Sequence, residues 1–187
     1  MDVTLSSAVV DFEVYLLMTM KPRLSLADAR GLLDGKLAKI RLSLDGAVRI
    51  HDRIAETLSE ETSRFRDMKT LLGVLDEDAT SLRYSSVLWP GFEFNAHAGV
   101  NGQLGSAGYT HTEHTPIDVE SPTQLAAWSA DIPEFDERFG PAIRRGKRPL
   151  FDDILPAYEE FEFLWKGDRY GAGFLWGLFL FSSAYWE

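Results

Sequence analysis

The C-terminal stretch from Gly171 to Glu187 is a nearly continuous apolar run, without a charged residue between Gly171 and Trp186. A helix that spans a bilayer needs about 20 apolar residues, so this run is too short. Its aromatic residues favour the pleated surface of a sheet, and a strand buried on both faces reads as a continuous apolar run. The stretch therefore predicts a central strand, or two short strands bent at Gly177.

The N-terminal stretch from Val9 to Met20 follows a different pattern. Apolar residues alternate there with Asp11, Glu13 and Tyr15, which is the period of a half-buried strand. Lys21-Pro22 follows directly, and proline is poorly tolerated inside a sheet. The pattern predicts a first strand that ends at this proline.

Apolar residues at steps of three and four predict helices over residues 25–44 and 47–75. Ser25 is the expected N-cap of the first helix, and Asp45-Gly46 the turn between them. Thr57 and Glu60 have the spacing of a capping box, so the second stretch could be two helices.

The middle of the chain is rich in glycine, threonine and aromatic residues, and it predicts strands at 82–88, 92–100 and 109–118. A helix over 121–132 is expected after the N-cap residue Ser121, with Pro122 at its first position. Another helix is expected over 154–165, before the final strand.

These elements predict an α+β fold in a single domain, with a mainly antiparallel sheet packed against several helices. The N-terminal strand and helices occupy residues 1–78, and the strand-rich middle occupies 81–119. Helices and the final strand occupy 120–187. A length of 187 residues suits one well-buried domain.

Charge narrows the possible partners. The chain has 19 lysines and arginines against 29 acidic residues, a formal net charge of −10, which disfavours nucleic acid and favours a basic protein. It has no cysteine, which excludes disulfides and thiolate chemistry. The acidic N-terminus does not resemble a signal peptide, so we expect a cytoplasmic protein without a membrane segment.

Histidines offer one candidate site for chemistry. His97, His111 and His114 could form a zinc site, with Glu113 as the general base of a metal-dependent hydrolase. Residues three apart on a straight strand point to opposite faces, so His111 and His114 converge only if the segment bends. The alternative is that these are polar residues on an exposed sheet face and that the protein has no cofactor.

Acidic residues near the C-terminus offer a candidate binding surface. Phe135 lies among them and is the expected aromatic anchor for a basic partner. The acidic residues expected to contact that partner are Asp131, Glu134, Asp136, Glu137, Glu159, Glu160 and Glu162.

The first functional hypothesis is therefore an acidic protein-binding module that inhibits a partner by covering its surface. A small, acidic, cysteine-free α+β protein without a catalytic motif is similar in general character to bacterial immunity proteins, which neutralise a toxin by binding it. The alternatives are the metal-dependent hydrolase, and a structural component of an assembly that makes contact through the aromatic residues of its C-terminus.

Overall fold

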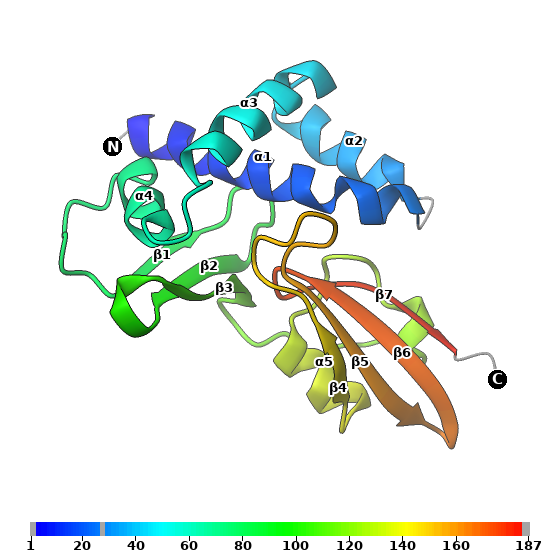
Figure 1. Ribbon diagram of the computed structural model, residues 1–187. Coiled ribbons are helices and arrows are strands. Elements are labelled where there is room, and N and C mark those ends of the chain that lie inside the picture. The colour runs from blue at the N-terminus through cyan, green and yellow to red at the C-terminus, as the bar shows by residue number, and fades with distance from the viewer. Residues whose placement is uncertain (1–2, 27–28, 185–187) are drawn as a thin grey trace. The chain divides into compact units, whose positions relative to one another are not determined.

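The computed structural model describes residues 3–26 and 29–184. Its elements are α1 (Val3–Leu26), α2 (Arg30–Lys39), α3 (Leu44–Thr57), α4 (Arg64–Leu71), β1 (Ser81–Ser85), β2 (Phe92–Ala98), β3 (Leu104–His111), α5 (Ile132–Phe139), β4 (Ile143–Lys147), β5 (Tyr158–Trp165), β6 (Asp168–Leu175) and β7 (Leu178–Ala184), with short 3-10 helices η1 (Val100–Gly102) and η2 (Pro122–Gln124) (Figure 1). The strands form two antiparallel sheets, which confirms the α+β class.

The chain divides into two compact units. The first comprises residues 1–90 and 95–107, and the second comprises 91–94 and 108–187. Strands β2 and β3 contribute residues to both units. The single-domain organisation expected from the chain length stays a prediction.

The predicted N-terminal strand is wrong, because residues 9–20 lie inside helix α1. Phe12, Leu16, Leu17 and Met20 are completely buried, so apolar residues are needed on nearly every side of this helix. The polar residues that gave this stretch the alternation of a strand have partners elsewhere in the fold. Oδ2 of Asp11, for example, lies 2.5 Å from Nη2 of Arg53 in α3.

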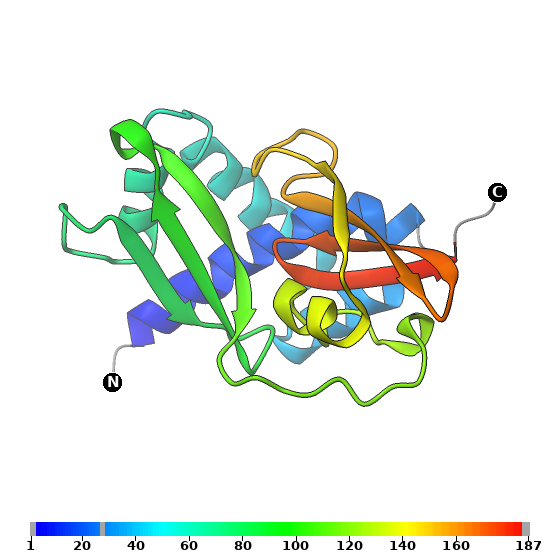
Figure 2. The same cartoon turned by 90° about the horizontal axis from the view of Figure 1, so that it is seen from below.

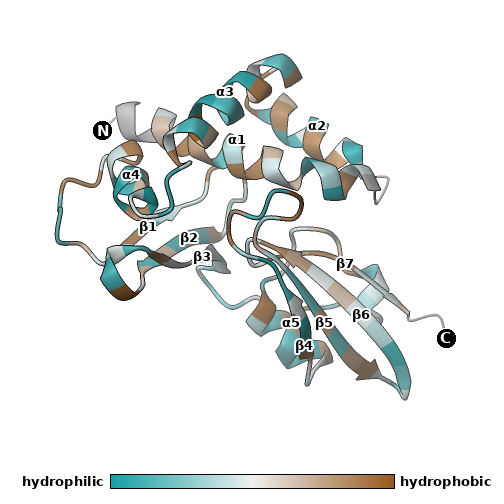
Figure 3. Ribbon diagram, in the orientation of Figure 1, coloured by the Kyte–Doolittle hydropathy of each residue, from teal (hydrophilic) through white to brown (hydrophobic). Residues whose placement is uncertain are grey.

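The helices that follow α1 begin at other residues than expected. Ser25 lies within α1, and the N-cap of α2 is Ala29. Ser43 caps α3, where its hydroxyl accepts a hydrogen bond of 3.1 Å from the amide of Gly46. The expected 47–75 helix is indeed two helices, and Thr57 ends α3 instead of capping α4. Hydrophilic residues cover much of α3 and α4 in Figure 3, as their charged pattern predicts.

A buried carboxylate organises the first unit. Glu13 of α1 is completely buried, and its oxygens accept hydrogen bonds from the hydroxyl of Ser86 and the amides of Val87 and Leu88, at 2.5, 2.9 and 2.7 Å. Lys36 of α2 donates to the carbonyl of Leu88. The segment after β1 is thus held against two helices.

The pKa of Lys36 in this cluster is shifted. Burial lowers the pKa of Lys36 from its ordinary value of 10.5 to about 8, and neighbouring Lys39 adds to the effect while Glu13 opposes it. Its ammonium lies 5.5 Å from the centre of the Trp89 ring. The lowered pKa makes the stability of the unit depend on pH.

In the second unit the strands follow the order β4-β5-β6-β7. The C-terminal run forms β6 and β7, which confirms the prediction of two strands bent at Gly177. Trp176 and Gly177 form the turn with φ of +51° and +80°, the positive values that the tight turns of twisted hairpins require. A side chain at Gly177 would also meet the carbonyl oxygen of Tyr109 at 2.6 Å.

Two predicted helices of the second unit are wrong. Residues 158–165 of the expected 154–165 helix form β5, whose Tyr158, Phe161 and Phe163 are buried by the sheet and its core. Only η2 occupies the start of the expected 121–132 helix, and the true helix, α5, begins at Ile132. Figure 2 shows α5, in yellow, beside the strands of this sheet.

We predict that the stability of the protein rises between pH 8 and 10.5 through Lys36. Its folded-state pKa lies below the unfolded value, so in this range the unfolded state binds more protons and a higher pH favours folding. Urea unfolding at about pH 7 and about pH 9.5 should show a larger gain for the wild type than for Lys36→Met.

Tyr15 is a second group whose shifted pKa affects stability at high pH. Burial raises the pKa of Tyr15 from 10.0 to about 12, so its contribution falls with pH, but only above pH 10. Equal pH dependence of the wild type and Lys36→Met would contradict the prediction.

Candidate functional site

Helix α5 turns two of its acidic residues inward. Asp131 is its N-cap and accepts a hydrogen bond of 2.9 Å from the amide of Glu134, while Glu134 accepts one of 3.2 Å from the amide of Asp131. This capping box satisfies two amides of the first turn. Only 5% of Asp131 and 4% of Glu134 is exposed, so neither is available to a partner as the sequence suggested.

His111, at the end of β3, completes this buried group. Its amide donates to Oδ2 of Asp131 at 2.9 Å, and its ring nitrogen Nδ1 contacts Oε2 of Glu134. Oε1 of Glu134 accepts from the amide of Thr115 at 2.9 Å. The imidazole stacks on Phe92 with ring centres 3.8 Å apart. The group therefore fastens the end of β3 and the segment after it to α5.

The same residues are the potential metal ligands that the structure brings together. Among the described residues, His111, Asp131 and Glu134 form such a group, with ligand atoms within 4.8 Å of one another. One imidazole and two carboxylates suit zinc. Each carboxylate already accepts backbone hydrogen bonds, however, so the network is complete without an ion.

The predicted trio of histidines does not correspond to this group. His97 is exposed on β2, and the exposed His114 lies 3.5 Å from Glu137 through its Nε2. Glu113 is exposed as well. Of the predicted metal residues only His111 belongs to the buried group. Its carboxylate partners, Asp131 and Glu134, lie about 20 positions further along the chain. The sequence predicted that these two residues are exposed.

Phe135 lies in the core, and its proposed role as an exposed anchor is wrong. Only 1% of it is exposed. Its ring lies 5.1 Å from the rings of Phe139 and Phe163, and 5.4 Å from that of Phe179. Helix α5 turns Phe135 toward the sheet because Phe135 follows the inward-facing Glu134 and precedes Phe139 by one helical turn.

The acidic residues of β5 are partly neutralised within the sheet. Arg144 of β4 lies 3.0 Å from Glu159, and Arg145 lies 3.1 Å from Glu162. The hydrogen bond from Arg145 lowers the pKa of Glu162, and the charge of Arg169 contributes. Glu160 is half-buried on the same strand. Arg144 and Arg145 of the basic cluster thus pair with acidic residues of their own sheet.

The remaining predicted contact residues, Asp136 and Glu137, lie on the exposed side of α5. The segment 112–121 runs beside this helix (Figure 2), because Arg138 donates hydrogen bonds to the carbonyls of Ile117 and Val119 at 3.2 and 2.8 Å. This segment carries further exposed carboxylates. We name as the α5 acidic surface the residues Glu113, Asp118, Glu120, Asp136 and Glu137.

The α5 acidic surface differs from β5 in its charge balance. None of its residues forms an ion pair with lysine or arginine in the part of the chain that the structure describes. Arg138, the nearest cation along the helix, is engaged by carbonyls and lies 5.2 Å from the ring centres of Phe139 and Trp165. The negative charge of the α5 acidic surface is therefore not neutralised by lysine or arginine within the described residues, although Asp136 accepts a hydrogen bond of 2.8 Å from the amide of Ala142.

Comparison with known proteins gives no relative for this arrangement. No protein-family model, no curated protein and no solved structure matches the chain. None of the helices in residues 3–26 and 29–184 combines the length and apolarity needed to cross a bilayer. The cytoplasmic location stays a prediction.

We predict that Phe135→Ala lowers the free energy of unfolding by about 3–5 kcal/mol, since it empties a core site lined by aromatic rings. Urea unfolding of the free protein measures the change. Leu164→Ala, an exposed substitution on β5, serves as the control and should have a small effect. A Phe135→Ala variant as stable as this control would contradict the core assignment.

We also predict that His111→Ala lowers the free energy of unfolding by about 1–3 kcal/mol, because the buried Glu134 loses its imidazole partner. His114→Ala removes only an exposed contact with Glu137 and should change stability by less than about 0.5 kcal/mol. Equal effects of the two substitutions, measured by urea unfolding, would contradict a structural role for the buried group.

Proposed function

We propose that this protein is a binding module that docks a basic protein partner through the α5 acidic surface and acts by covering a functional surface of that partner. The observation that carries the proposal is the exposed, unneutralised charge of this surface. Glu159 and Glu162 of the same unit have arginine partners, whereas Asp136 and Glu137 have neither lysine nor arginine as a partner among the described residues.

The physical role of such a surface is to steer and orient a partner. Concentrated charge of one sign raises the association rate of an oppositely charged protein, and this effect weakens as salt screens it. Arg138 supports the role by holding the segment 112–121 beside α5. The carboxylates of two separate stretches of chain therefore act together.

The other functions suggested by the sequence have less support. His97 and His114 lie outside the buried metal-ligating group, so no observation favours a three-histidine hydrolase. Contact through the C-terminal aromatic residues is not favoured either, because Phe174, Trp176 and Phe179 are buried. Tyr185 and Trp186 lie outside the described residues.

We predict that reversing two charges of the surface, Asp136→Lys with Glu137→Lys, slows association with the partner by about tenfold or more at low salt and flattens its salt dependence. The matched control is Glu60→Lys with Glu61→Lys, exposed residues of the first unit that change the net charge equally.

The measurement has two steps. Each protein is immobilised and exposed at low salt to a lysate of its source cells, and association kinetics are then measured with a protein that the wild type and the control variant retain but the Asp136/Glu137 variant does not. If the immobilised wild type, the control variant and the Asp136/Glu137 variant all retain the same proteins, or if none of them retains a protein, the proposed function is wrong.

A further inference from the structure

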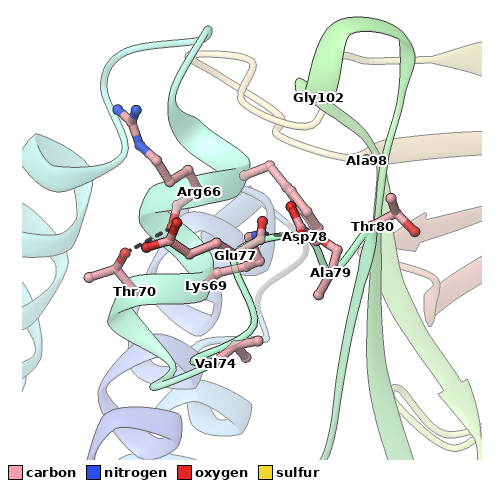
Figure 4. A pocket seen from close by; sticks show the side chains of 11 residues that line it. Arg66, Lys69, Thr70, Val74, Glu77, Asp78, Ala79, Thr80, Ala98 and Gly102 are labelled. Carbon is pink, nitrogen blue, oxygen red and sulfur yellow. Dashed lines mark hydrogen bonds between the residues drawn. The ribbon is translucent and has the colours of Figure 1, made fainter.

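The first unit contains a pocket of about 610 Å³, which lies between α4, the segment before β1 and the turn after β2 (Figure 4). A pocket of this size can hold a small ligand or a few side chains of a partner. Its apolar lining comes from Phe65, Val74, Ala79 and Ala98, with Thr70 of α4 at one side.

Lys69 gives this pocket a pre-formed wall. Its ammonium donates hydrogen bonds to the carbonyls of Asp76, Glu77 and Ala79, at 3.3, 2.5 and 3.1 Å, and only 7% of the residue is exposed. All three of its N–H donors are therefore used inside the protein. Lys69 fixes the 76–79 segment against α4 and offers no donor to a ligand.

Two exposed aliphatic residues are sequence neighbours of the residues that line this pocket. Leu75 follows the lining residue Val74 and is 94% exposed, and Val100 lies between the lining residues Ala98 and Gly102 and is 84% exposed. Single exposed aliphatic residues are common on protein surfaces. Each of these two residues extends the apolar surface next to a lining residue.

The charge around the pocket is negative on one side. Asp76, Glu77 and Asp78 are exposed on the segment that forms this wall. Arg66 also lines the pocket, but its guanidinium points away from Glu77 and Asp78 in Figure 4 and lies 3.7 Å from Asp67. A ligand at this wall would meet carboxylates next to apolar side chains.

We propose that this pocket docks a short segment of a partner protein in which an aliphatic side chain is flanked by lysine or arginine. The aliphatic side chain would enter the pocket, neighbouring residues of the segment would contact Leu75 or Val100, and the flanking cations would pair with Glu77 and Asp78. The pairing of apolar contact with opposite charge supplies both affinity and orientation.

A second copy of this chain is a less suitable occupant. Its own basic segment, β4, has the required composition, but it is hydrogen-bonded to β5, and its Arg144 and Arg145 pair with Glu159 and Glu162. We therefore assign the segment to another protein. This inference is independent of the α5 acidic surface, which belongs to the other unit.

Fluorescence anisotropy with a synthetic peptide tests the proposal. The probe is a labelled peptide whose adjacent leucines are flanked on both sides by lysines, and its matched controls carry serine for leucine or glutamate for lysine. The wild-type protein should bind the probe at least about tenfold more tightly than either control peptide. Equal binding of the leucine and serine peptides would reduce the interaction to general charge attraction and overturn the proposal.

Variants locate the binding site. Thr70→Trp fills the pocket from an exposed position and Leu75→Ser removes apolar contact, so each should weaken binding of the probe by about tenfold. Thr62→Trp and Leu164→Ser are the matched controls, exposed but outside the lining, and should bind the probe as the wild type does. Unchanged binding by both Thr70→Trp and Leu75→Ser would overturn the proposal.

Charge variants separate this site from the α5 acidic surface. Glu77→Gln with Asp78→Asn should weaken binding of the probe and reduce its salt dependence. Glu60→Gln with Glu61→Gln, exposed residues outside the lining that change the net charge equally, should leave binding of the probe unchanged. If the Asp136/Glu137 variant loses the probe and the Glu77/Asp78 variant keeps it, the pocket is not the docking site.

Discussion

Buried carboxylates that accept backbone hydrogen bonds from distant parts of the chain hold each unit together. A buried carboxylate is costly unless hydrogen-bond donors surround it, so its donors must take up their positions when the unit folds. Glu13 draws in the 86–88 segment, and Glu134 draws in Thr115 and His111. Removal of either carboxylate would leave backbone amides without their acceptors. Because both residues are buried, neither is part of a binding surface.

These carboxylates also explain which parts of the fold could be predicted from the sequence. The C-terminal hairpin could be predicted, because its apolar run and Gly177 reflect local requirements of strands and a tight turn. The helix at residues 9–20 could not be told from a strand by alternation alone. Its polar positions, Asp11 and Glu13, are decided by partners that lie more than 40 residues away. Length was the better guide there, since strands rarely exceed eight residues.

The prediction of a helix at 154–165 was wrong because tertiary packing outweighs the local preference of its residues. Its glutamates are good helix formers, but Tyr158, Phe161 and Phe163 lie in a sheet whose other strands come later or earlier in the chain. Intrinsic helix preference is worth a few tenths of a kcal/mol per residue, whereas burial of each aromatic side chain is worth about 1.5–3 kcal/mol. Tertiary packing therefore outweighs local preference at this position.

The candidate site shows how far acidic composition alone can be used. Asp131, Glu134, Asp136 and Glu137 are neighbours in sequence, yet the helix separates them into an inward pair and an outward pair. The capping box of Asp131 and Glu134 could be predicted from the sequence, since an acidic residue followed three positions later by glutamate is its pattern. The role of His111 could not be predicted from the sequence, because it depends on the contact between the end of β3 and the start of α5. Because the inward carboxylates fix α5 and Arg138 fixes the segment beside it, the outward carboxylates are held in place before any partner arrives. A charged surface held in this way loses little conformational entropy on binding, which makes it more suitable for recognition than the same residues on a mobile tail.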